Sequence, residues 1–186
     1  MRMLHEVHRD ELVWVRPKWS RFFFELRAGE TVVATLAWTG GSRAVAECAG
    51  AQYRFSREGW LRPRILVREG ATGRPTGAGA PEETVATFVR RRGGGTLTFS
   101  DGRTFLWRKL RVWTSERVWA DVNEMVLVRF NPVTRESPVT VSSEPQAADL
   151  AELPLLILLG QYLVVLAAQD AAAAGTAASV AVIASS

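Results

Sequence analysis

Short segments in which apolar and polar residues alternate dominate the chain before about residue 146. Tyr53 and Phe55 alternate with polar neighbours, and β-branched residues fill much of the segment from Thr31 to Trp38. Patterns of this kind predict β-strands. Such segments follow one another at 12–17, 21–27, 31–38, 43–48, 52–57, 64–69, 84–91, 96–100, 104–108, 110–113, 117–121, 125–130 and 139–142. These thirteen candidate segments predict roughly eleven or twelve strands, most of them joined by hairpins.

Turn signals separate these segments and indicate how the strands connect. Asp101-Gly102 lies between two alternating segments, which is a strong hairpin signal. Residues 70–83 carry four Gly and two Pro. They predict a flexible surface loop and not a domain linker, because the strand patterns resume unchanged beyond them. Many short strands without a helical period favour an antiparallel sandwich or barrel, and closure into a barrel would remove exposed sheet edges.

An apolar run from Leu153 to Ala168 follows the strands, with Gln161 and the hydroxyl of Tyr162 as its only polar side-chain groups. A helix made from it would be apolar on every face, so it must be enclosed by protein or inserted in lipid. The run is shorter than the roughly 18–20 residues that cross a bilayer. It also lacks the flanking Lys and Arg that mark the cytoplasmic ends of membrane spans. We therefore expect a helix at about 146–169 that fills the barrel, with Gly160 permitting close approach to the wall; a tail anchor is the alternative.

The predicted organisation is a lead-in at 1–10, a closed antiparallel β-barrel around a C-terminal apolar helix at 11–169, and a loosely packed Ala-rich tail at 170–186. A comparison with known architectures rests on this order of elements and on the segments 53–56, 104–108, 125–130 and 153–166. In these features the chain resembles the tubby C-terminal-like superfamily, which includes tubby proteins, phospholipid scramblases and LURP-one-related proteins. The resemblance implies a barrel of about twelve strands and, by analogy with tubby proteins, binding of phosphoinositide headgroups through basic residues. The chain lacks the proline-rich region and the cysteine cluster of the scramblases, so scrambling is not implied.

Charge is distributed unevenly along the chain. All 23 basic residues lie at or before Arg135, whereas no Lys or Arg follows it. A basic body favours anionic partners such as phospholipid headgroups or nucleic acid, although an arginine-rich composition is also compatible with solvated strands alone. Nucleic-acid binding is the less favoured of the two, because Trp107, Trp113 and Trp119 lie in strand segments where they more often pack a core than stack bases.

The strongest candidate site is a group of basic residues next to a glycine turn. Glycines at 93–95 leave backbone N–H groups accessible, and neighbouring arginines can bind phosphate oxygens bidentately. The predicted lipid- or anion-binding residues are Arg90, Arg91, Arg92, Arg103, Arg108, Lys109 and Arg111. If 84–92 and 96–100 form a hairpin, these charges should lie near one end of the barrel.

No catalytic constellation is recognisable in the sequence. The only histidines, His5 and His8, are three residues apart without a third ligand, and Cys48 is the single cysteine. We therefore expect no catalytic residues, no metal and no cofactor. The first hypothesis is a non-enzymatic tubby-like module that binds anionic phospholipid headgroups; the alternative is a structural or protein-interaction domain without a lipid ligand and with an unknown protein partner. The N-terminus has no secretory pattern, which predicts a cytoplasmic protein, at the membrane periphery if the lipid hypothesis holds.

Overall fold

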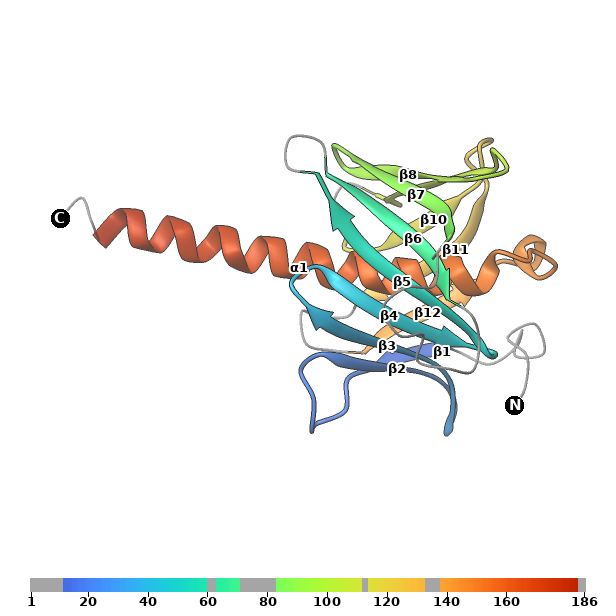
Figure 1. Cartoon of the computed structure of the whole chain (residues 1–186), viewed down its shortest axis with the longest axis horizontal. Coiled ribbons are helices and arrows are strands. Elements are labelled where there is room, and N and C mark those ends of the chain that lie inside the picture. The colour runs from blue at the N-terminus through green and yellow to red at the C-terminus, as the bar shows by residue number, and fades with distance from the viewer. Residues whose placement is uncertain (1–11, 60–62, 71–82, 112–113, 133–137, 184–186) are drawn as a thin grey trace.

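Twelve antiparallel strands form a closed barrel in a computed structural model of the chain (Figure 1). The structure describes residues 12–59, 63–70, 83–111, 114–132 and 138–183, with side chains described as far as residue 174. The strands are β1 (Leu12–Val15), β2 (Phe23–Ala28), β3 (Thr31–Gly40), β4 (Arg43–Cys48), β5 (Ala51–Glu58), β6 (Arg64–Gly70), β7 (Glu83–Arg91), β8 (Gly94–Phe99), β9 (Thr104–Lys109), β10 (Arg117–Ala120), β11 (Val126–Pro132) and β12 (Val139–Ser143).

Each strand pairs with its neighbours in the chain, and β1 pairs with β12 to close the ring through Leu12↔Val141 and Trp14↔Val139. The barrel predicted from the alternating pattern is therefore confirmed. One predicted strand is wrong: Leu110 and Arg111 lie in a bend after β9, and the rest of that segment, 112–113, lies outside the described residues. Of the predicted surface loop at 70–83, Gly70 ends β6 and Glu83 begins β7, while residues 71–82 lie outside the described residues.

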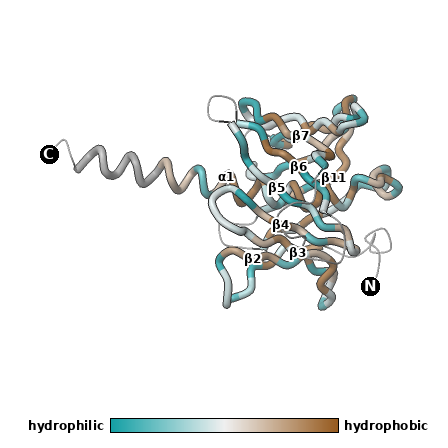
Figure 2. Tube along the Cα trace, in the orientation of Figure 1, coloured by the Kyte–Doolittle hydropathy of each residue, from teal (hydrophilic) through white to brown (hydrophobic). Residues whose placement is uncertain are grey.

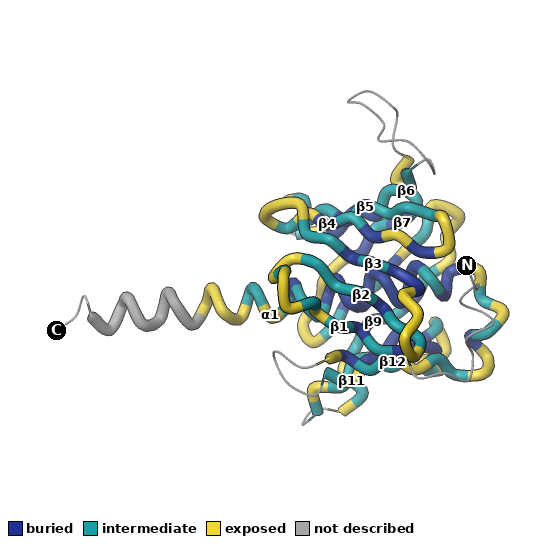
Figure 3. The backbone as a smooth tube through the Cα atoms, turned by 90° about the horizontal axis from the view of Figure 1, so that it is seen from below, coloured by how far each residue is buried: buried dark blue, intermediate teal, exposed yellow. Residues whose placement is uncertain are grey.

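A single helix, α1 (Leu153–Ile183), runs through the barrel after a 3₁₀ turn, η2 (Pro145–Ala147). The nine residues 155–163 are all buried, which places every face of this part of the helix against the wall. Figure 3 shows the buried stretch of α1 enclosed by strands, and Figure 2 shows apolar residues along it. By length and composition alone α1 could cross a membrane over Leu153–Ala174, but the barrel encloses the apolar run of the predicted core helix.

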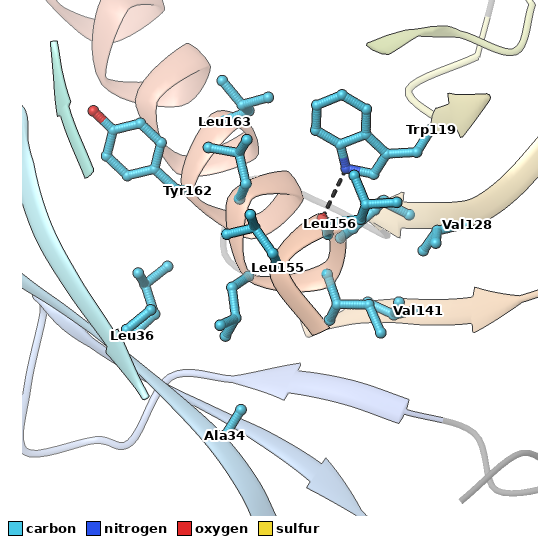
Figure 4. Close-up of a cluster of buried hydrophobic side chains, with 14 of the residues drawn as sticks. Ala34, Leu36, Trp119, Val128, Val141, Leu155, Leu156, Tyr162 and Leu163 are labelled. Carbon is cyan, nitrogen blue, oxygen red and sulfur yellow. Dashed lines mark hydrogen bonds between the residues drawn. The ribbon is translucent and has the colours of Figure 1, made fainter. Parts of the chain in front are cut away.

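Specific contacts fix the helix inside the wall. The indole N–H of Trp119 on β10 donates a hydrogen bond to the carbonyl oxygen of Leu156, 2.7 Å away (Figure 4). The hydroxyl of Tyr162 donates to the carbonyl oxygen of Ser42 in the β3–β4 turn, also at 2.7 Å. A Cβ atom at Gly160 would collide with the ring of Phe130 on β11. The expectation that Gly160 permits close approach of helix and wall is thus correct, because only glycine fits between α1 and β11.

The helix boundaries differ from those predicted. The segment before Leu153 forms η2 and turns instead of the first turns of the helix, while α1 continues to Ile183 where a loosely packed tail was predicted from residue 170. Alanine has the highest intrinsic helix propensity, so an Ala-rich tail can prolong a helix without any apolar periodicity. In Figure 1 this continuation of α1 projects beyond the sheet.

Candidate functional site

The two ends of the barrel can be assigned from its topology. Because consecutive strands alternate in direction, the β1–β2, β3–β4, β5–β6, β7–β8 and β9–β10 connections all lie at one end. Arg57 on β5 and Arg90 on β7 both contact Asp170 of α1, so this is the end from which the helix projects (Figure 1). The opposite end carries the β2–β3, β4–β5, β8–β9 and β10–β11 turns and the segment that leads into α1.

Charge is segregated between these ends. Among the described residues, the end from which α1 projects carries the basic side chains of Arg16, Lys18, Arg21, Arg43, Arg57, Arg64, Arg90, Arg91, Arg92, Lys109, Arg111 and Arg117. Its described acidic residues are Glu58, Glu116 and Asp170. The opposite end carries Glu30, Glu47, Glu69, Glu83, Asp101, Asp121, Glu124, Glu144, Asp149 and Glu152, and the basic residues Arg27 and Arg103. The remaining charged residues of the described strands lie on the wall between the ends: Glu25, Arg54, Arg68, Arg108 and Arg129. We call the first the basic end and the second the acidic end.

Asp170 joins two arginines at the mouth of the basic end. Its carboxylate lies 3.0 Å from Nη1 of Arg57 and 2.5 Å from Nη1 of Arg90. Arg117 lies at the same mouth, where it donates a hydrogen bond to the carbonyl oxygen of Gly93 at 3.3 Å. Burial, and secondarily the charge of Arg90, lower the pKa of Arg117. The carboxylate of Asp170 therefore pairs with two of these three arginines, Arg57 and Arg90, and Arg117 lies beside them.

The structure separates the predicted site residues. Arg90 and Arg91 end β7 and Arg92 lies in the β7–β8 turn, while Lys109 is the last residue of β9 and Arg111 lies just beyond it, so these five share the basic end. Arg108 points outward from β9 and donates to the carbonyl oxygen of Glu124 at 3.2 Å. Arg91, Arg92, Lys109 and Arg111 are exposed.

Arg103 does not belong with the others. It lies in the β8–β9 connection at the acidic end, where it pairs with the carboxylates of Asp101 and the buried Glu152. Its hydrogen bonds lower the pKa of Asp101, while the same carboxylate raises the pKa of Arg103. The prediction that Arg103 joins the basic group was wrong, because its strand runs from the acidic end toward the basic end and Arg103 precedes it.

The glycines at 93–95 also have a different role from the one predicted. Gly94 and Gly95 lie in β8, paired on one side with Arg91 and Arg90 and on the other with β9. A Cβ atom at Gly95 would collide with the ring of Phe88. Gly95 thus leaves room for the Phe88 ring, and both glycines lie in the hydrogen-bonded ladder of β8 with its neighbours. They do not form the predicted phosphate-binding loop.

A depression on the outer wall was not foreseen from the sequence. It has a volume of about 530 Å³ and is lined by Thr39, Arg43, Ala44, Val45, Arg54, Phe55, Ser56, Arg57, Glu58 and Arg68. Register places Arg54 opposite Arg68 and Arg43 opposite Ser56, which brings arginines from β4, β5 and β6 to one surface. Arg68 donates to Ser56 Oγ at 3.0 Å and to Glu58 Oε1 at 2.8 Å. Alternation along β5 could have shown that Arg54, Ser56 and Glu58 share a face, but the cross-strand partners require the register.

Two aromatic side chains at the basic end were also missed. Trp19 is 74% exposed and Phe22 is 61% exposed, and both lie in the β1–β2 connection with Lys18 and Arg21. The sequence predicted a strand from residue 21, but β2 begins at Phe23, whose ring stacks with that of Trp19 at a centroid distance of 5.2 Å. The apolar run 22–24 therefore divides between an exposed loop and the wall.

Neither the described residues nor the comparisons with known proteins indicate a reaction or a metal ion at the basic end. The described residues hold no cluster of three or more His, Cys, Asp or Glu side chains suited to a metal ion, and His5 and His8 lie outside them. Comparison of the chain with protein-family models, with curated proteins and with solved structures gave no match.

Proposed function

We propose that this protein is a non-enzymatic, tubby-like β-barrel that binds anionic phospholipid headgroups at a membrane surface through its basic end. The observation that carries the proposal is the segregation of charge between the two ends of the barrel. A surface with basic side chains on one end and acidic ones on the other is oriented by a negatively charged bilayer. The tubby-like assignment is supported by the closed twelve-strand barrel around a C-terminal apolar helix.

The strength of such binding follows from the number of cations near the lipid surface. Each Lys or Arg near an anionic membrane contributes about 1 kcal/mol, and the attraction decays within a Debye length of about 8 Å at physiological salt. Arg91 and Arg92 are exposed at the tip of the β7–β8 hairpin, so they are suited to act as surface cations. The depression on the outer wall that includes Arg43 and Arg54 supplies a second, concave place for a phosphate group, where planar guanidinium groups can bind bidentately.

Co-sedimentation with vesicles tests the proposal. Vesicles of phosphatidylcholine alone are compared with vesicles that contain about one third phosphatidylserine. Replacing Arg91 and Arg92 by Gln removes about 2 kcal/mol of attraction, which corresponds to roughly 30-fold weaker binding to anionic vesicles. The matched control adds the same change in net charge at the acidic end, through Val122→Glu and Asn123→Glu, both exposed.

The expected result is strong loss of binding for the first variant and less than about twofold change for the control. Equal binding of the parent to neutral and anionic vesicles would overturn the proposal, as would equal losses in both variants. Absence of vesicle binding, together with partner capture that salt does not weaken, would support the alternative of a structural or protein-interaction domain.

A further inference from the structure

Helix α1 is longer than the barrel requires. Among the residues whose side chains the structure describes, Leu166 is the last buried one in α1, and Asp170 marks the mouth of the basic end through its contacts with Arg57 and Arg90. The helix then continues to Ile183. At 1.5 Å per residue, residues 171–183 extend for about 20 Å beyond the mouth. Figure 1 shows this projecting part of α1 clear of the sheet.

The projecting helix has a composition that does not suit water. No charged residue follows Asp170 in the sequence, and Ala171, Ala172, Ala173 and Ala174 are all exposed. Isolated helices of fewer than about 12–15 residues are marginal in water even when they are rich in alanine. The barrel holds the first part of α1 and so supports this continuation, but the exposed, uncharged surface of the projecting turns is left available to a partner.

The surroundings of the helix at the mouth indicate which partner this is. The exposed rings of Trp19 and Phe22 lie at the same end, next to Lys18 and Arg21. Tryptophan is enriched where a protein meets the boundary between lipid and water, because its ring is apolar and its N–H is polar. The exposed cations Arg91 and Arg92 belong to the same end. An uncharged helix that leaves the barrel at the end where cations and two aromatic rings are exposed matches the layers of an anionic bilayer.

We propose that residues 171–183 of α1 insert into one leaflet of an anionic bilayer, with Trp19 and Phe22 at the headgroup level and the barrel outside. The proposal rests on the proposed function, to which it adds a mode of attachment and an orientation. The dimensions agree: a headgroup region of about 6 Å and a leaflet core of about 15 Å together match the projecting length. Attachment would thus combine a shallow hydrophobic anchor with electrostatic contacts, as stable membrane association generally requires two signals.

A fluorescent label in the full-length chain tests the insertion directly. Val180→Cys is labelled with the environment-sensitive dye NBD; Cys48 is 3% exposed and its thiol has a pKa raised to about 12 by burial, so the dye goes to the introduced cysteine. On addition of anionic vesicles we expect a blue shift, protection from aqueous iodide, and quenching by lipids that carry a spin label in the acyl chain. Val122→Cys, at the acidic end, is the control and should stay accessible to iodide.

A second variant gives a readout that does not depend on the dye. Val180→Asp places a charge on the projecting helix without changing the barrel, and it should weaken binding to anionic vesicles at least fivefold. Val122→Asp carries the same substitution at the acidic end, where Val122 is 65% exposed, and should have little effect.

The outcomes separate the two proposals. Anionic vesicle binding with an NBD label that stays accessible to iodide overturns the insertion and leaves the proposed function in place. Insertion into neutral and anionic vesicles alike supports the anchor and overturns the role of the basic end. Protection of the label without vesicles, rising with protein concentration, shows that a second copy covers the helix and also overturns the insertion.

Discussion

Replacing Gly160 by alanine distinguishes a helix enclosed by the barrel from one that lies elsewhere. In a helix surrounded by lipid or water, Gly→Ala stabilises the folded state by about 1 kcal/mol, because alanine restricts the unfolded chain and has the better helix propensity. In the barrel, the new Cβ would lie 2.6 and 2.7 Å from two Cε atoms of the Phe130 ring, and closer still to its Cζ. The sign of the effect therefore reports where the helix is.

The magnitude follows from how little Phe130 can move. Its side chain is fully buried, and its ring packs against Trp107 at a centroid distance of 5.3 Å. Overpacking a filled core by one methyl group costs about 1–3 kcal/mol, and contacts this short require a shift of ring or helix at the upper end of that range. After the gain of about 1 kcal/mol in propensity, we expect a net destabilisation of about 1–2 kcal/mol.

Urea unfolding followed by tryptophan fluorescence and circular dichroism measures this difference as a shift in midpoint at constant m-value. The matched control is the same substitution in a Phe130→Leu background, where the shorter side chain leaves room for the methyl group. There Gly160→Ala should be neutral or stabilising, so the two substitutions should show strong coupling. An increase in stability on Gly160→Ala in the parent chain would contradict the enclosed helix.

Two further predictions concern charge and pH. Asp170→Asn removes the carboxylate shared by Arg57 and Arg90. Because these groups are about one third or more exposed, we expect the free energy of urea unfolding to fall by less than about 1 kcal/mol, while binding to anionic vesicles becomes roughly fivefold tighter. Weaker vesicle binding would argue against a role of the basic end. Burial raises the pKa of the Cys48 thiol from 9.0 to about 12, so its contribution to stability is complete below pH 9 and is lost as pH rises toward 12. Cys48→Ala should therefore make unfolding free energy fall less steeply over that range, and identical slopes in parent and variant would refute the assignment.

The wall and the buried part of the helix were predictable because each has a local signal. Alternation with glycine turns identifies strands such as β5, and the run from Leu153 to Ala168 cannot be a surface helix. The projecting helix gave no such signal, since alanine, serine and glycine show no apolar periodicity. Its helical state is the continuation of a segment that the barrel already holds in place.

The site was less accessible from the sequence because it depends on which turns share an end. Arg90 and Lys109 lie near the ends of β7 and β9, which run toward the basic end, whereas Arg103 precedes β9 and lies at the opposite end. Arg103 and Arg108 are close in sequence, so the sequence alone did not show that β9 places them toward opposite ends of the barrel. The depression that includes Arg54 and Arg68 needs the pairing of β5 with β6, which no single segment contains.

The order of the elements has a consequence for how the chain folds. Strands β1 and β12 close the ring, yet they come from near the two ends of the chain, and the helix that fills the ring comes after both. During synthesis the whole wall is made before α1, so inward side chains that contact the helix, such as Trp119 and Phe130, lack this contact until α1 has been made. Contacts so distant in sequence make folding slow and leave apolar strands exposed to aggregation in the meantime. We therefore expect the nascent chain to need protection by chaperones until α1 has been made and can enter the barrel.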